Sequence, residues 1–192
     1  MQEVSIRCGT PNDAASLSQL WRETFVDAYA DVHSAEDMLS YMDRYYTEAQ
    51  ALDALNDHET DVLFAVKNEE LFGVAIVRRS AGSYPSASPR GAELKHLYIK
   101  ARAYGRAVGQ RLFQAAMRAA KDRGADTLWL SVSDKNPRAQ RFYQKNGFRR
   151  VDTGPTLQVG RDTLTTSVLA RSFSDLLSSR PDTNGRIDQD RA

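Results

Sequence analysis

The stretch IKARAYGRAVGQRLFQAAM, residues 99–117, is the part of the sequence that best predicts the fold. An apolar strand pattern at 93–99 runs into a short basic loop, and a long Ala-rich helix pattern follows at 106–123. The first N–H groups of a helix have no partners within it, and the helix dipole adds partial positive charge at that end. A strand–loop–helix unit of this kind is typical of anion sites.

The loop 104–109 itself is predicted to hold a diphosphate. Gly105 and Gly109 leave room for phosphate oxygens to reach the backbone, and Arg102 and Arg106 add charge at the rim. The spacing matches neither GxxxxGK[ST] nor GxGxxG with a distant acidic residue, so the ATPase-type and dinucleotide-type loops are disfavoured. The alternative is a surface turn with solvated arginines.

A second stretch, LWLSVSDKNPRAQRFYQKNGF at 128–148, makes the pattern more specific. Together with ELKHLYI (93–99), AYGRAVGQRL (103–112) and TLWLSV (127–132), it resembles the GNAT superfamily of acetyl-CoA-dependent N-acetyltransferases, over roughly residues 4–169. The resemblance implies an α/β fold with a mixed, splayed sheet of about seven strands flanked by helices. It also implies acetyl-CoA as co-substrate. We expect one acetyltransferase domain at 1–172 and a polar, disordered tail at 173–192.

The family loop motif is Gln/Arg-x-x-Gly-x-Gly/Ala, and the sequence matches it in two registers. One register places Tyr104, Ala107 and Gly109 at the motif positions, and the other starts at Arg102 and shifts the helix start. In both registers the resemblance implies cofactor contacts through the backbone of the same segment: Tyr104, Gly105, Arg106, Ala107, Val108, Gly109 and Gln110.

Strand 93–99 is predicted to carry the catalytic base. Strand alternation places Glu93 and Lys95 on one face and His96 on the other. An alkylamine is mostly protonated at neutral pH, so a group must take its proton. In the resembled family this role is often carried on this face, which makes Glu93 the candidate; the alternative is a surface glutamate. His96 is interpreted as a structural histidine.

The resemblance also implies a bulge in strand 93–99 that separates it from strand 126–132. The backbone N–H of Leu97 or Tyr98 would then stabilise the oxyanion formed on the thioester. The pantetheine arm would enter along Leu97, Tyr98 and Ile99.

Residues 136–148 supply the remaining cofactor contacts. Pro137 can begin a helix that Asn136 caps. The resemblance implies that Asn136 also bonds the pantetheine arm, with Ala139 beside it. It implies that Tyr143 contacts the cofactor and protonates the departing thiolate; the alternative is an aromatic residue packed in the core.

Three helix-start signals, at Thr10, Ser34 and Thr47, mark an early helical region. In the resembled family this region forms part of the acceptor wall. Candidates to contact a cationic amine are the aromatic and acidic residues Phe25, Tyr29, Asp31, Tyr41, Asp43, Tyr45 and Tyr46, unless they are core and solvated surface. The Ser/Pro/Gly-rich loop 80–91 could be a lid or an inert excursion.

Composition limits the remaining function classes. With 26 Lys and Arg against 25 Asp and Glu, a nucleic-acid binder relying on bulk charge is disfavoured. No apolar run suits a membrane span, and one cysteine, Cys8, fits a reducing cytoplasm. The three histidines lack metal-ligand spacing, so we expect no metal. A homodimer is suggested by the family alone.

The sequence therefore predicts transfer of an acetyl group from acetyl-CoA to a primary amine by direct attack, without an acyl-enzyme on Cys8. The aspartate of RDTLTTSVLA (161–170) and the motifs above look most like bacterial polyamine or small-amine acetyltransferases. Two alternatives remain: an enzyme acting on a protein N-terminus or lysine, and a non-catalytic acyl-CoA-binding module.

Overall fold

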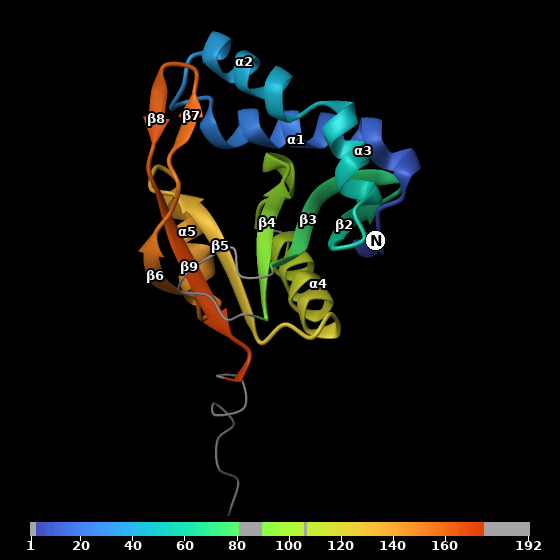
Figure 1. Cartoon of the computed structure of the whole chain (residues 1–192). Coiled ribbons are helices and arrows are strands. Elements are labelled where there is room, and N and C mark those ends of the chain that lie inside the picture. Colours follow the sequence, from blue (N-terminus) through green and yellow to red (C-terminus); the bar gives the residue numbers. More distant parts are fainter. Residues whose placement is uncertain (1–2, 81–89, 106, 175–192) are drawn as a thin grey trace, which may run out of the picture.

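The computed structural model describes residues 3–80, 90–105 and 107–174. A seven-stranded mixed sheet runs in the order β1-β2-β3-β4-β5-β9-β6 (Figure 1). Its strands are β1 (Ser5–Cys8), β2 (Thr60–Lys67), β3 (Glu70–Ser80), β4 (Gly91–Ile99), β5 (Thr127–Ser133), β6 (Arg149–Thr153) and β9 (Thr166–Ser172). The helices are α1 (Ala14–Tyr29), α2 (Ala35–Tyr45), α3 (Glu48–Asn56), α4 (Val108–Asp122) and α5 (Pro137–Lys145). The predicted α/β fold is confirmed.

The predicted helix starts are also confirmed. Thr10 forms a capping box with Asp13, before a short turn that leads into α1. The Ser34 hydroxyl accepts the first-turn N–H of α2 at 3.1 Å, and the Thr47 hydroxyl accepts that of α3 at 3.2 Å. These local bonds satisfy N–H groups that the helices leave open.

Two hydrophobic cores cover the two faces of the sheet. Alternation along β3 sends Ala75 and Val77 to the side of α4 and α5, and Val74 and Ile76 to the side of α1, α2 and α3. The last described part of the chain belongs to the core on the side of α4 and α5. There, Phe173 is buried beneath the ammonium of Lys121. The remainder of the predicted tail, 175–192, and loop residues 81–89 lie outside the described residues.

The bulge expected in β4 is present and falls at Lys95. In the antiparallel pairing with β3, Val77 lies opposite Leu94 while Ile76 lies opposite His96, so Lys95 is the extra residue. The parallel pairing of β4 with β5 covers only Gly91–Glu93. Beyond that point the two strands separate, which confirms the splayed sheet.

The bulge corrects the predicted facing of His96. One extra residue reverses the alternation, so His96 and Tyr98 share the face of Glu93, while Leu94 and Leu97 pack on the side of α4. The prediction that His96 points away from Glu93 is therefore wrong.

A small hairpin that the sequence analysis did not predict completes the fold. The strand expected at 163–169 is divided between β8 (Asp162–Leu164) and β9, and β8 pairs with β7 (Leu157–Val159). The hairpin reaches the helical layer (Figure 1), where Asp162 lies 2.7 Å from Nδ1 of His33. A Cβ at Gly160 would collide with Asp37 of α2, so the turn packs directly on that helix.

The turn between β2 and β3 provides a test of the fold. Asn68 and Glu69 both have positive φ, 50° and 63°, as a two-residue type I′ turn requires. Glu69→Gly is expected to raise the free energy of unfolding by about 0.5–1 kcal/mol, because glycine adopts this conformation without strain. Chemical denaturation measures the change, with Asn68→Gly as the matched control of smaller effect. A less stable Glu69→Gly protein would contradict the turn geometry.

Candidate active site

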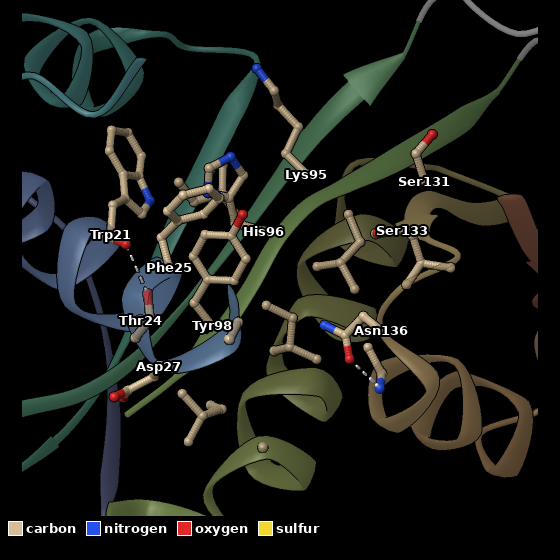
Figure 2. A pocket seen from close by; sticks show the side chains of 18 of the residues that line it. Trp21, Thr24, Phe25, Asp27, Lys95, His96, Tyr98, Ser131, Ser133 and Asn136 are labelled. Atoms are coloured by element: carbon tan, nitrogen blue, oxygen red, sulfur yellow. Dashed lines mark hydrogen bonds between the residues drawn. The ribbon is translucent and has the colours of Figure 1, made fainter. Parts of the chain in front are cut away.

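A cavity of about 1120 Å³ opens where β4 and β5 separate. One wall comes from α1, α2 and β4, and the other from the ends of β5 and α5 and the start of α4. Figure 2 shows Trp21, Phe25, His96 and Tyr98 on one side and Ser133 and Asn136 on the other. Every predicted catalytic and cofactor-binding residue that the structure describes lines this cavity; Arg106 lies outside the described residues. Arg102, predicted at the rim of the diphosphate loop, does not line it and pairs with Glu70.

The predicted diphosphate loop ends in an open helix N-terminus. Ala107 is left-handed, with φ of 60°, so α4 begins at Val108 and not at residue 106 as predicted. The first backbone hydrogen bond of α4 is donated by the N–H of Arg111 to the Ala107 carbonyl, at 3.0 Å. The N–H groups of Val108, Gly109 and Gln110 thus precede the first helical bond.

This helix start agrees with the register that places Tyr104, Ala107 and Gly109 at the motif positions. The two loop glycines, Gly105 and Gly109, have open space beside them. A Cβ added at Gly109 would contact only Ile99, at 3.7 Å, and one added at Gly105 would have no neighbour within 4 Å. An anion can therefore reach the backbone here without displacing packed side chains.

Two side-chain contacts link this loop to α5. The guanidinium carbon of Arg138 lies 3.1 Å from the centroid of the Tyr104 ring. The Gln110 amide donates to Oδ1 of Asn146 at 3.0 Å, so any contact of Gln110 with an anion would come from its backbone N–H. The sequence analysis identified Tyr104 and Gln110 but not their partners, which lie far away in the chain.

The first turn of α5 has the predicted cap. The N–H of Ala139 donates to Oδ1 of Asn136 at 3.0 Å. From across the cavity, the Tyr29 hydroxyl interacts with Asn136 and Ser133, which lowers its pKa, while burial raises it more. Tyr29 therefore joins the helical layer to the α5 side of the cavity.

Tyr143 is a core residue that also lines the cavity. Its side chain is 7% exposed, and its ring centroid lies 5.5 Å from that of Phe142 and 5.6 Å from that of Phe148. Burial raises the pKa of its phenol above the usual value, so the hydroxyl keeps its proton at neutral pH. A protonated phenol in this position can act as a hydrogen-bond and proton donor.

Burial shifts the pKa values of Glu93 and His96, on one face of β4, in opposite directions. Burial raises the pKa of the Glu93 carboxyl, and the charges of Lys95 and Arg78 oppose this shift. Burial, with Lys95 adding to it, lowers the pKa of His96 to about 3, so this imidazole is neutral at physiological pH. Of the two groups, the Glu93 carboxyl is thus the one whose pKa shifts toward neutral pH.

The cavity wall formed by the helical layer is aromatic, and the acidic residues that line the cavity differ from those predicted. All five predicted aromatic residues line the cavity: Phe25, Tyr29, Tyr41, Tyr45 and Tyr46. Asp31 and Asp43 do not line it, because both face solvent; Asp43 pairs with Arg22 at 2.6 Å. The sequence analysis missed three aspartates that do line it: Asp27, Asp53 and Asp57.

Two of these three aspartates already have partners. Asp27 accepts the N–H of Ala101 at 2.8 Å, and Asp57 lies 3.6 Å from Nε of Arg78. Within the described residues, no cluster of three or more His, Cys, Asp or Glu side chains could hold a metal ion. A search of the same residues finds no helix with the length and apolar character needed to cross a membrane.

Comparison with known proteins gives a consistent result. The chain matches the acetyltransferase (GNAT) family over residues 15–148. An uncharacterised N-acetyltransferase of Mycobacterium tuberculosis (strain H37Rv) is 31% identical over 137 residues, which is 71% of this chain and 83% of that protein. The spermidine N(1)-acetyltransferase of Thermoplasma acidophilum is 27% identical over 154 residues, covering 78% of this chain and 91% of the relative.

Solved structures share the fold. The PaiA N-acetyltransferase from Thermoplasma acidophilum, in complex with coenzyme A, has a TM-score of 0.76 at 23% identity, covering 90% of this chain and 100% of that one. A GCN5-related N-acetyltransferase from Rhodopseudomonas palustris has a TM-score of 0.69, also at 23% identity, covering 90% of this chain and 97% of that one.

A pair of substitutions at Gly109 tests the open helix N-terminus. Gly109→Ala and Gly109→Leu are both expected to fold at least as stably as the parent, because space surrounds the position and both residues favour helix. Leucine would cover the free N–H groups, so its affinity for coenzyme A should fall at least about tenfold while alanine stays close to the parent. Calorimetric titration measures this. If the leucine variant binds coenzyme A as tightly as the parent does, the loop does not take part in binding.

Proposed function

Because this chain belongs to the acetyltransferase (GNAT) family, we propose that it transfers the acetyl group of acetyl-CoA directly to a small primary amine. Acetyl-CoA-dependent N-acetylation follows from the family; the direct route and the kind of amine are the proposal. The observation that carries it is one cavity that joins an open helix N-terminus, a gap between two strands and an aromatic wall.

The residues on the α4 and α5 side suit coenzyme A, whose thioester supplies the acetyl group. The N–H groups of Val108, Gly109 and Gln110 bind the diphosphate. Along the gap, β4 and β5 no longer bond to each other beyond Glu93, so their facing edges are available to the amides of the pantetheine arm. Asn136 and Ala139 border the same path.

Three groups of this chain perform the chemistry. Glu93 takes a proton from the ammonium, directly or through water, so that the nitrogen can attack the carbonyl carbon. A backbone N–H at Leu97 or Tyr98 stabilises the negative charge that develops on the oxygen. As the new C–N bond replaces the C–S bond, the Tyr143 hydroxyl gives its proton to the sulfur, and the second proton lost by the nitrogen returns through water to the phenolate.

The acceptor half of the cavity favours a small amine. Aromatic ring faces attract alkylammonium groups. The wall that the helical layer forms contains several aromatic rings. Pro155 and Leu157, the first residue of β7, also line the cavity, so the β7–β8 hairpin borders this end. The 27% identical spermidine acetyltransferase supports polyamines as the first acceptors to test.

A panel of acceptors provides the direct test. Release of the free thiol of coenzyme A is measured with polyamines, amino alcohols, alkylamines, amino acids and lysine peptides. Small amines are expected to exceed peptides at least about tenfold in kcat/KM, because a small amine fits among the aromatic side chains of the cavity more readily than a peptide backbone does. Preference for peptides would favour the protein-acetylating alternative, and no turnover at all would favour a binding module.

Tyr143→Phe tests the general acid. Loss of the hydroxyl is expected to lower kcat about a hundredfold, since the thiolate must leave without a proton donor. The affinity for coenzyme A and the melting temperature should stay close to the parent, because the ring and its packing against Phe142 and Phe148 remain. Unchanged turnover would return Tyr143 to a purely structural role.

Glu93→Gln tests the general base through pH dependence. In the parent, kcat/KM should rise with pH through the raised pKa of Glu93, because only the ionised carboxylate accepts a proton. Glutamine should abolish this limb of the profile. Glu36→Gln, on the exposed surface of α2, is the matched control. Superimposable profiles for Glu93→Gln and the parent would exclude the role.

The same variant has an expected effect on stability. A carboxyl whose pKa is raised on folding favours the folded state when protonated, and this contribution is lost as pH rises through the folded pKa. At neutral pH, Glu93→Gln should therefore be slightly more stable than the parent in chemical denaturation. A less stable variant would mean that the carboxylate is stabilised by its surroundings.

A further inference from the structure

Two buried ring atoms in the acceptor half of the cavity lack a hydrogen-bond partner among the described residues. They are Nε1 of Trp21 and Nδ1 of His96. Trp21 is 4% exposed, both side chains line the cavity, and their ring centroids lie 5.2 Å apart. In Figure 2 the indole nitrogen lies on the edge of the ring that faces His96. Leaving such an atom unbonded is unfavourable, because burial removes its hydrogen bonds to water without replacing them.

The neighbouring polar side chains are already bonded to other groups. The hydroxyls of Tyr46 and Tyr98 lie 3.1 Å apart and bond to each other. The Thr24 hydroxyl donates to the Leu20 carbonyl at 2.7 Å. Trp21 is also held in place, because its ring packs against Tyr46 with a centroid separation of 5.6 Å. The indole N–H therefore faces the cavity with no internal acceptor at hand.

The chemistry of the two atoms restricts what can satisfy them. An indole N–H only donates, so it needs an acceptor atom. A neutral imidazole offers one donor and one acceptor, and which of them Nδ1 provides depends on the tautomer. An ammonium group cannot accept a hydrogen bond, and a buried carboxylate would need a positive partner. Lys95, the cation nearest in sequence, is exposed, and in Figure 2 its side chain extends away from the rings.

We propose that the acceptor amine carries an uncharged oxygen, a hydroxyl or a carbonyl, that accepts the N–H of Trp21 and shares a hydrogen bond with Nδ1 of His96. This inference rests on the proposed function, because it describes the part of the acceptor that does not react. A hydroxyl suits both tautomers of His96, since it accepts and donates at once. Amino alcohols and amino amides are then preferred over simple alkylamines and over polyamines, whose far nitrogens are protonated.

Matched acceptors test the proposal with the intact enzyme. At each chain length, kcat/KM is compared for an amino alcohol, the alkylamine that has a methyl group in place of the hydroxyl, and the diamine. The amino alcohol is expected to exceed the alkylamine about 5- to 100-fold, the range that corresponds to one buried hydrogen bond. Equal rates, as an ordered water bonded to both atoms would produce, or a preference for diamines would overturn the proposal.

Trp21→Phe links this preference to the indole N–H. It keeps an aromatic ring but removes the donor, so the ratio of kcat/KM between amino alcohol and alkylamine should fall to about one. Trp129→Phe is the matched control, because Trp129 is the other tryptophan of the chain and does not line the cavity. Its ratio should remain that of the parent. A ratio that survives in Trp21→Phe would overturn the proposal.

A binding measurement keeps the proposal testable if Trp21→Phe does not fold. In the Trp129→Phe protein, Trp21 is the only indole, and its fluorescence reports on hydrogen bonding at Nε1. Amino alcohols should shift the emission while matched alkylamines should not, and equal responses would overturn the inference. If no amine is acetylated but the amino alcohol still shifts the emission, the proposed function fails and the oxygen-binding site stands.

Discussion

The structure depends on the point at which the hydrogen bonds between β4 and β5 end. After Glu93 the backbone of β4 no longer bonds to β5, and the extra residue Lys95 lies at the start of this separation. The cavity lies in this gap, and the N–H groups at the start of α4 lie at the same opening. Tyr143 approaches from α5, and the helical layer closes the opposite end.

Local chemistry explains what could be predicted from the sequence. The caps at Ser34, Thr47 and Asn136 are short-range bonds between residues three apart, so the residue types alone predict them. The glycine loop and its helix were likewise predictable, apart from the start at Val108. There, Ala107 adopts a left-handed conformation and precedes the first helical residue, and an alanine in the sequence gives no sign of such a conformation.

The remainder depends on long-range geometry. The position of the bulge determines that His96 faces the cavity, and strand alternation alone cannot locate an extra residue. The β7–β8 hairpin and the contact of Arg138 with Tyr104 join residues that are distant in sequence, so no local pattern marks them. The domain limit at 172, the homodimer, the cytoplasmic location and the roles of the site residues stay predictions.

The β7–β8 hairpin has a further consequence for how this enzyme could diversify. It forms its own two-stranded sheet, outside the seven-stranded one, and touches the helices through His33, Asp37 and the hairpin residues Gly160 and Asp162. Insertions or exchanges there would remodel the acceptor end without disturbing the central hydrogen-bond ladder. Part of the cavity border can thus change while the seven-stranded sheet stays intact.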